Sequence, residues 1–105
     1  MSEYIKFLRQ HLGYTPLLQV GASVIVINQA GQMLMQQRTD CGSWGYAGGS
    51  VELGESVEQT AERELFEETG LKAKKLELLG VYSGERMQYT YPNGDKVSNV
   101  DIVYT

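Results

Sequence analysis

Apolar and polar residues alternate at helical spacing near the start of the chain. The pattern predicts a helix over residues 3–12, whose apolar positions lie on one side. Ser2 can cap the start of this helix, and Gly13 ends it. The positions that share the apolar side are Tyr4, Ile5, Leu8 and Leu12.

Five further stretches have the β-branched or alternating character of strands. Residues 20–27 (VGASVIVI) predict a buried strand, and residues 28–31 have turn chemistry. Residues 32–38 are then expected to return as the second strand of a hairpin. Further strands are predicted over residues 75–82, 86–91 and 96–104, and the turn residues 92–95 join the last two as a hairpin.

A second helix is predicted over residues 57–69, after a glycine-rich loop. Ser56 and Gln59 fit a capping box at its start, and Gly70 fits the left-handed position just past its end. Helices that pack on a mixed sheet make the fold class α/β (α+β).

The second helix carries carboxylates on the side that should face the protein. At about 100° per residue, Glu64 and Glu68 share a sector with the apolar stripe, and Glu67 lies close by. Carboxylates turned toward a protein body cost several kcal/mol unless a positive charge compensates them. A hard divalent cation with oxygen ligands supplies that charge, and Mg²⁺ is the usual one beside phosphates.

Length and charge narrow the classes of protein that fit. A chain of 105 residues allows one domain, and 42% apolar residues are enough for a core. The net charge of −4 and the absence of a long Lys/Arg cluster argue against binding to duplex nucleic acid. The single cysteine, Cys41, suits a reducing cytoplasm, and no apolar run is long enough to predict a membrane span.

Residues 49–71 (GSVELGESVEQTAERELFEETGL) resemble the signature of the Nudix (MutT-like) hydrolases. The resemblance implies a single Nudix domain over residues 1–105, with residues 49–71 as its loop-helix box. It also implies an α/β/α sandwich with a mixed sheet. Because the family's fold normally continues with a further strand and a second large helix, we expect the domain to be truncated at its C-terminus.

The same resemblance assigns roles in metal binding. Glu67 and Glu68 are implied as metal ligands, and Glu64 as a third ligand or as the group that orients the attacking water. The carbonyl of Gly48 matches a backbone ligand of the family. The cofactor implied is Mg²⁺, with Mn²⁺ as the alternative.

Other residues are implied to complete the site. Arg63 and Glu55 match a pair that holds the loop against the helix, and we count both in the catalytic constellation with Glu64. Arg38 matches an arginine that contacts substrate phosphate, although an edge-strand surface charge is an equal alternative. Ala47 stands where a proline is common, which loosens the loop without removing a reactive side chain.

Several points stay open in the sequence. The general base is either Glu64 or a residue beyond position 105, because Glu85 is a poor candidate. Glu52 fits a solvated loop carboxylate better than a site residue. Base recognition would need stacking surfaces, for which strand packing is the commoner use of the candidates. These candidates are Trp44, Tyr46, Tyr82, Tyr89 and Tyr91.

The function implied is Mg²⁺-dependent hydrolysis of the pyrophosphate bond in a nucleoside diphosphate linked to another moiety. A nucleoside triphosphate, ADP-ribose or a dinucleoside polyphosphate would be the small-molecule substrate. The alternatives are a non-catalytic Nudix-like nucleotide-binding or regulatory module and, last, a structural Ca²⁺ site. The oligomeric state is left open, a homodimer included.

Overall fold

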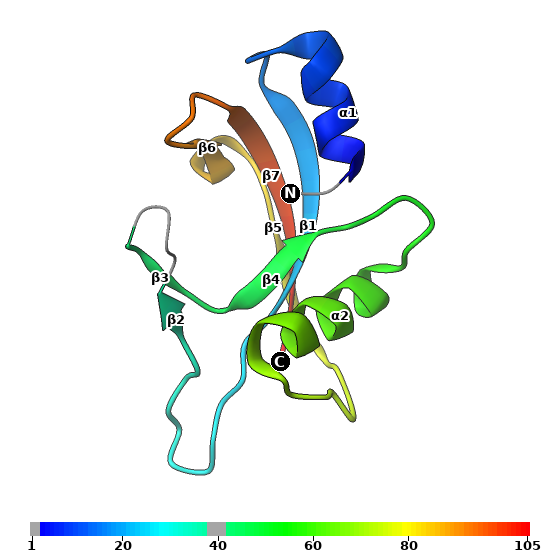
Figure 1. Ribbon diagram of the computed structural model, residues 1–105. Coiled ribbons are helices and arrows are strands. Elements are labelled where there is room, and N and C mark those ends of the chain that lie inside the picture. Colours follow the sequence, from blue (N-terminus) through cyan, green and yellow to red (C-terminus); the bar gives the residue numbers. More distant parts are fainter. Residues whose placement is uncertain (1–2, 38–41) are drawn as a thin grey trace.

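The computed structural model describes residues 3–37 and 42–105 as helices packed on a mixed sheet (Figure 1). The helices are α1 (Glu3–Leu12) and α2 (Val57–Thr69), with a short 3₁₀ turn η1 (Glu85–Met87). Within these residues, neither helix has the length and apolar character needed to cross a bilayer. The strands are β1 (Leu17–Val24), β2 (Gln36–Gln37), β3 (Trp44–Gly45), β4 (Ala47–Ser50), β5 (Leu78–Tyr82), β6 (Gln88–Thr90) and β7 (Lys96–Tyr104).

The main sheet has the strand order β4-β1-β7-β5, with β6 also paired to β7. The long strands β1 and β7 run parallel in its centre, from Leu17 opposite Val97 to Val24 opposite Tyr104. Every other pairing in this sheet is antiparallel. The strand β4 is therefore an edge strand that pairs with β1, and it is the last strand before α2 in the chain.

The helix α2 begins and ends where its capping residues dictate. Ser56 Oγ accepts the backbone N–H of Gln59, and the Gln59 side chain accepts the backbone N–H of Ser56. Gly70 has φ of 77°, a left-handed conformation that glycine adopts without steric cost. The Gly70 N–H donates to the Phe66 carbonyl and closes the last turn.

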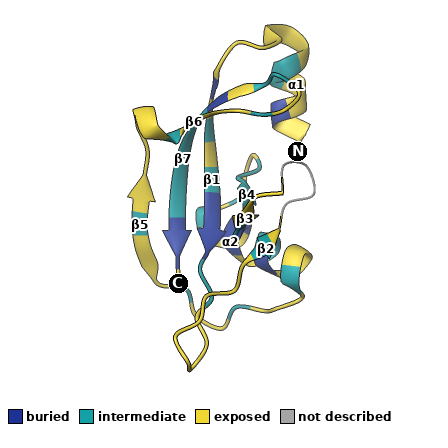
Figure 2. Cartoon of the chain, turned by 90° about the vertical axis from the view of Figure 1, so that its left-hand side faces the viewer, coloured by how far each residue is buried: buried dark blue, intermediate teal, exposed yellow. Residues whose placement is uncertain are grey.

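The core lies between α2 and the strands β1 and β4. Ala61 and Leu65 of α2 are buried against Ala22, Val24 and Ala47. The small side chains at this contact allow the helix to approach the sheet closely. Figure 2 shows that the ends of β1 and β7 near α2 are buried, whereas β5 is exposed for most of its length.

The helix α1 is fixed to the opposite end of the sheet by one arginine. The Arg9 guanidinium donates to the carbonyls of Gly13, Thr15 and Lys96, and its Nε lies 3.7 Å from Asp95 Oδ1. Of the expected apolar side of α1, only Ile5 is buried. Arg9 therefore ties α1 to the start of β7 by directed bonds rather than by a wide apolar contact.

The predictions for three elements are confirmed at both ends: residues 3–12, 57–69 and 96–104. The predicted strand over residues 20–27 lies three residues earlier, at Leu17–Val24. The strands predicted at 75–82 and 86–91 are shorter, and the second begins as the 3₁₀ turn η1. The mixed sheet with helices agrees with the expected fold class.

The predicted hairpin between residues 20–27 and 32–38 forms only next to its turn, where the Leu34 N–H donates to the Val26 carbonyl. Ile27 and Met33 form one isolated bridge, and β2 pairs with β3 in a separate two-stranded sheet. The partner of β1 on that side is β4 instead. The turn at residues 28–31 does form, with Gly31 at φ 80°, but the strands diverge after it.

Replacing Ser56 by alanine should destabilise the protein by about 1 kcal/mol, because the Gln59 N–H loses its capping partner. Urea unfolding followed by circular dichroism measures this difference. Ser83→Ala, at an exposed position between β5 and η1, is the control and should change the free energy of unfolding little. Equal stability of the two variants would contradict the assigned cap.

Candidate functional site

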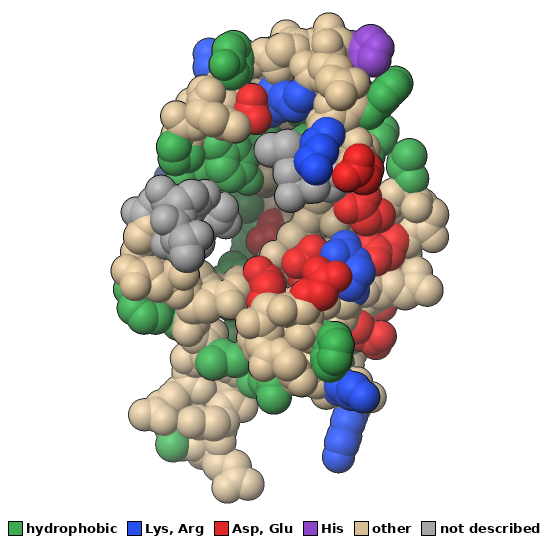
Figure 3. Space-filling view, viewed as in Figure 1, with side chains coloured by type: hydrophobic (Ala, Val, Ile, Leu, Met, Phe, Trp, Pro, Cys, Tyr) green, Lys and Arg blue, Asp and Glu red, His purple; other side chains and the backbone are tan. Residues whose placement is uncertain are grey.

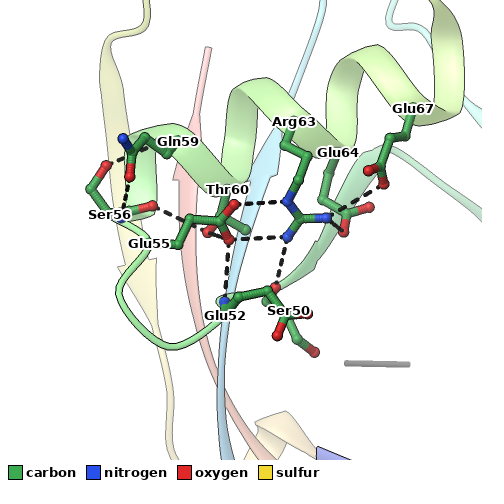
Figure 4. Close-up of polar contacts among 9 residues, drawn as sticks. All are labelled: Ser50, Glu52, Glu55, Ser56, Gln59, Thr60, Arg63, Glu64 and Glu67. Atoms are coloured by element: carbon green, nitrogen blue, oxygen red, sulfur yellow. Dashed lines mark hydrogen bonds and ion pairs between the residues drawn. The ribbon is translucent and has the colours of Figure 1, made fainter. Parts of the chain in front are cut away.

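One arginine on α2 holds the loop that precedes the helix. Arg63 Nε donates to Glu55 Oε2 at 2.8 Å, and Arg63 Nη2 donates to Glu55 Oε1 at 3.0 Å (Figure 4). This two-point contact between a planar guanidinium and a carboxylate fixes direction as well as distance. The loop carrying Glu55 is therefore held against the middle of α2.

The same guanidinium reaches two carboxylates of its own helix and the edge strand. Arg63 Nη1 donates to Glu64 Oε1 at 2.8 Å and lies 3.4 Å from Glu67 Oε2. Arg63 Nη2 also donates to the Ser50 carbonyl at 3.3 Å. Glu55 and then Glu64 raise the pKa of Arg63, so this side chain stays charged. Arg63 thus joins the loop, the helix and β4 at one point.

Glu55 is satisfied from three directions. Besides Arg63, it accepts the backbone N–H of Glu52 at 3.2 Å and the hydroxyl of the fully buried Thr60 at 2.6 Å. These hydrogen bonds, that of Arg63 above all, lower the pKa of Glu55 from 4.5 to about 2. The residue is an ionised anchor at neutral pH, with little freedom to act as a proton carrier.

Glu64 lies at the closest approach between α2 and β4. Its side chain is only 17% exposed, and a Cβ at Gly49 would stand 2.4 Å from Glu64 Oε1. Burial raises the pKa of Glu64, the charges of Glu68 and Glu67 raise it further, and Arg63 opposes them. The missing side chain at Gly49 is therefore what leaves room for this carboxylate.

Glu68 reaches the next residue along β4. Glu68 Oε2 accepts the backbone N–H of Gly48 at 2.9 Å. A Cβ at Gly48 would stand 2.9 Å from the Ala22 carbonyl and 2.5 Å from Ser23 Oγ, so only glycine fits here without a backbone shift. The space beside Gly49 is thus occupied by the Glu64 carboxylate, whereas the space beside Gly48 is occupied by β1.

The donor set of this region suits a hard divalent cation. Three glutamate side chains and the backbone of Gly48 supply oxygen atoms, the ligands that Mg²⁺ and Mn²⁺ prefer. Over residues 3–37 and 42–105, no three acidic, histidine or cysteine side chains are already gathered into a metal site. Arg63 stands between Glu64 and Glu67, and the Glu67 side chain is 56% exposed. In this arrangement Arg63 therefore supplies the positive charge between these two carboxylates.

A cleft of about 850 Å³ opens beside these carboxylates. Figure 3 shows acidic side chains gathered around a basic one next to a hollow in the surface. The volume is in the range of small-molecule sites. The cleft passes from the helix across β4 onto the face of β1 and β7, and its polar lining includes Gln19, Ser23, Asn99 and Asp101.

The structure brings most of the expected site residues together. Glu55, Arg63, Glu64 and Glu67 form one bonded group, and Glu68 with Gly48 lies beside it. Arg38 lies outside the described residues.

Among the aromatic candidates, Tyr46 and Tyr91 line the cleft, whereas the Trp44 side chain is mostly exposed on β3. Glu85 lies in η1, and Glu52 both lines the cleft and bonds Glu55 through its backbone.

Sequence reasoning missed two parts of this region. Thr60 was not singled out, although a threonine in the first turn of a helix is placed to bond a loop carboxylate. The polar face of β1 was hidden because residues 20–27 read as a uniformly buried strand. In the neighbouring strand β7, the sequence did contain a signal. Asn99 and Asp101 occupy alternate positions within residues 97–102, so their side chains lie on one face of the sheet.

Comparison with known proteins places the chain in a family. The sequence model described as the NUDIX domain matches residues 17–105. The chain is 44% identical over 68 residues to a Bacillus subtilis (strain 168) protein named "Putative 8-oxo-dGTP diphosphatase", which covers 65% of this chain and 46% of that protein. It is 37% identical over 67 residues to an RNA pyrophosphohydrolase of Edwardsiella ictaluri, covering 64% and 36%. The chain thus matches less than half the length of these relatives.

Solved structures agree in fold. A MutT protein from Methanosarcina mazei Go1 superposes with a TM-score of 0.65 at 22% identity, covering 84% of this chain and 63% of that one. A MutT protein from Bacillus halodurans gives a TM-score of 0.62 at 31% identity, covering 83% and 56%. Each covers most of this chain and roughly three fifths of the other.

The ion pair between Glu55 and Arg63 should make the free energy of unfolding depend on pH. Because the folded pKa is about 2 and the ordinary value is 4.5, the contribution is fully present above pH 4.5 and is lost as pH falls toward 2. Glu55→Gln cannot ionise, so we expect the stability gap between wild type and this variant to shrink over that interval. Urea unfolding at pH 6, 4 and 3 measures it, and a gap that does not change with pH would contradict the assignment.

Proposed function

Because the chain belongs to the NUDIX domain family, we propose that it takes part in divalent-metal-dependent hydrolysis of a pyrophosphate bond in a nucleotide. In this proposal, residues 1–105 belong to a single Nudix domain, truncated at its C-terminus, and residues 49–71 form its loop-helix box. The substrate is a nucleoside diphosphate linked to another moiety. The printed names of the relatives, a diphosphatase and an RNA pyrophosphohydrolase, support this bond type.

The observation that carries the proposal is the position of Glu64. This carboxylate is largely shielded from solvent in a space that exists only because residue 49 lacks a side chain, and it lines the cleft. A surface helix has no need to direct a carboxylate there against the cost of desolvation. Two more carboxylates, Glu67 and Glu68, stand within one helical turn of it.

Glu64, Glu67 and Glu68 would hold the cation together with the Gly48 carbonyl, and Mg²⁺ or Mn²⁺ fits these oxygen donors. A divalent cation at such a site neutralises phosphate charge and lowers the pKa of bound water. Glu64 has a second task in this scheme, which is to accept a hydrogen bond from the attacking water and so orient it. The water oxygen forms a bond to one phosphorus, and the bridging oxygen leaves with the other phosphate.

Arg63 and Glu55 act by position rather than by contact with the substrate. Glu55 takes two of the guanidinium's N–H groups and Glu64 takes a third, so the arginine fixes where Glu64 points. Such a partner of a metal ligand commonly affects metal affinity by about 10- to 100-fold. Arg38 remains our candidate for contact with substrate phosphate.

Wild-type protein with Mg²⁺ should release phosphate, pyrophosphate or nucleoside monophosphate from a panel of nucleoside triphosphates, ADP-ribose and dinucleoside polyphosphates. Glu68→Gln should reduce kcat by roughly 100-fold, in the range found when one charge-stabilising group is removed. Glu62→Gln, a neutralised carboxylate on the exposed side of the same helix, is the matched control and should retain activity. Nucleotide binding without turnover in the wild type would favour the non-catalytic module instead.

The two glycines of β4 should respond differently to alanine. Gly49→Ala displaces only the end of the Glu64 side chain, so it should weaken Mn²⁺ affinity with little change in stability. Gly48→Ala meets the backbone of Ala22, so it should lower the melting temperature. Mn²⁺ titration by electron paramagnetic resonance and thermal unfolding measure the two effects. Equal Mn²⁺ affinity of wild type and Gly49→Ala would count against Glu64 as part of the metal site.

A further inference from the structure

The floor of the cleft carries a carboxylate that the proposed hydrolysis does not use. Asp101 lies in the middle of β7, in register with Gly21 of β1, and it lines the same cleft as Glu64. Asp101 is partly buried, and it lies on the same face of the sheet as Gln19, Ser23 and Asn99. The middle of this face is polar on both central strands, although buried Leu17, Val97 and Val103 lie on the same face.

Among residues 3–37 and 42–105, Asp101 has one side-chain hydrogen bond, which orients it, and no ion pair with a cation. Ser23 Oγ donates to Asp101 Oδ1 at 2.9 Å. Burial raises the pKa of Asp101, and the Ser23 hydrogen bond opposes that effect. In the part of the chain that the structure describes, the two arginines lining the cleft are bonded elsewhere, Arg9 near Asp95 and Arg63 to Glu55. A ligand group that meets Asp101 therefore meets an acceptor with spare lone pairs.

The neighbours of Asp101 in the cleft include a glycine of β1 and one tyrosine. Gly21 has no side chain, and a Cβ there would lie 3.3 Å from the Gly49 carbonyl oxygen and 3.9 Å from Asp101 Oδ1. Tyr46 also lines the cleft, and its burial together with the charge of Asp101 raises the pKa of its hydroxyl. Tyr46 therefore stays neutral and adds an aromatic ring to the lining of the cleft, the kind of side chain on which bases stack.

The charge of the cleft decides which end of a nucleotide lies here. Glu52, Glu64, Glu67 and Asp101 all line it, so phosphate is held best where a bound cation compensates this negative charge, beside α2. The floor at Asp101 repels a second anionic group. It suits a neutral group that donates hydrogen bonds.

We propose that Asp101, oriented by Ser23, is a specificity-determining residue that accepts hydrogen bonds from a guanine-type base edge. This inference rests on the proposed nucleotide substrate and names the base that the cleft selects. An ionised carboxylate only accepts hydrogen bonds, and it can accept two in parallel. The guanine edge presents two adjacent donors, N1–H and the exocyclic amine. Adenine, cytosine and uracil each have a single donor on that edge, so the carboxylate could not accept two parallel hydrogen bonds from them.

The test compares binding of GMP and IMP, which differ only in the exocyclic amine of the base. Wild-type protein with Mg²⁺ should bind GMP about tenfold more tightly than IMP, as expected for one hydrogen bond to a charged group. Asp101→Asn keeps the shape but offers only one acceptor, so this ratio should fall to about one. Ser23→Ala should reduce the ratio less, because it loosens the carboxylate without removing it. Isothermal titration calorimetry measures all of these affinities.

Glu77→Gln is the control, because it changes net charge by the same amount at an exposed site that pairs with Lys75. It should keep the GMP preference, and thermal unfolding should show that Asp101→Asn is folded. Equal affinity for GMP and IMP in the wild type would overturn the proposal, as would a preference that survives Asp101→Asn. A preference for GMP over dGMP that disappears in Asp101→Asn, without a GMP to IMP difference, would show that Asp101 binds the ribose and would also overturn it.

Binding of monophosphates needs no hydrolysis, so the two proposals fail separately. A GMP preference that depends on Asp101, in a chain without turnover on any substrate, would support this inference and contradict the hydrolase. Turnover with equal kcat/KM for GTP, ITP and ATP would contradict this inference and leave the hydrolase standing.

Discussion

The guanidinium of Arg63 is the constraint on which the candidate site depends. It contacts Glu55 on the loop, Glu64 and Glu67 on α2 and the Ser50 carbonyl at the end of β4. Three carboxylates cannot stand this close together without a positive charge among them. By supplying that charge from within the chain, Arg63 holds the loop, the helix and the edge strand in one arrangement before any ligand is present.

The close approach of α2 to β4 determines where the carboxylates of the helix lie. Alanines at the contact and glycine at position 49 let the helix carboxylates reach the strand. The cleft then runs from these carboxylates across β4 to a polar floor on β1 and β7. One side of the edge strand thus suits a cation with phosphates, and the other suits a neutral group that donates hydrogen bonds. The phosphates and the base of a nucleotide have these two kinds of chemistry.

Local chemistry made the helix α2 predictable, and non-local pairing limited the rest. Ser56, Gln59 and Gly70 fix the ends of α2 through contacts within a few residues, so the sequence predicts its bounds. The pairing of β1 with β4 and β7 depends on residues far apart in the chain, and the hairpin expected from residues 20–38 formed only next to its turn. The carboxylates of the helix were predicted from their spacing. Asp101 was missed because only the register of β7 against β1 brings it beside Ser23.

The central claim is that Glu64, Glu67 and Glu68 gather on one helix to receive a divalent cation. Crystals of the protein grown with Mn²⁺ and a non-hydrolysable pyrophosphate analogue test it directly, because manganese is located by its anomalous scattering. The account predicts a manganese peak bound by these glutamate oxygens beside Gly48, with the analogue in the adjoining cleft. A metal peak at another place, or none while the three side chains point into solvent, would contradict it.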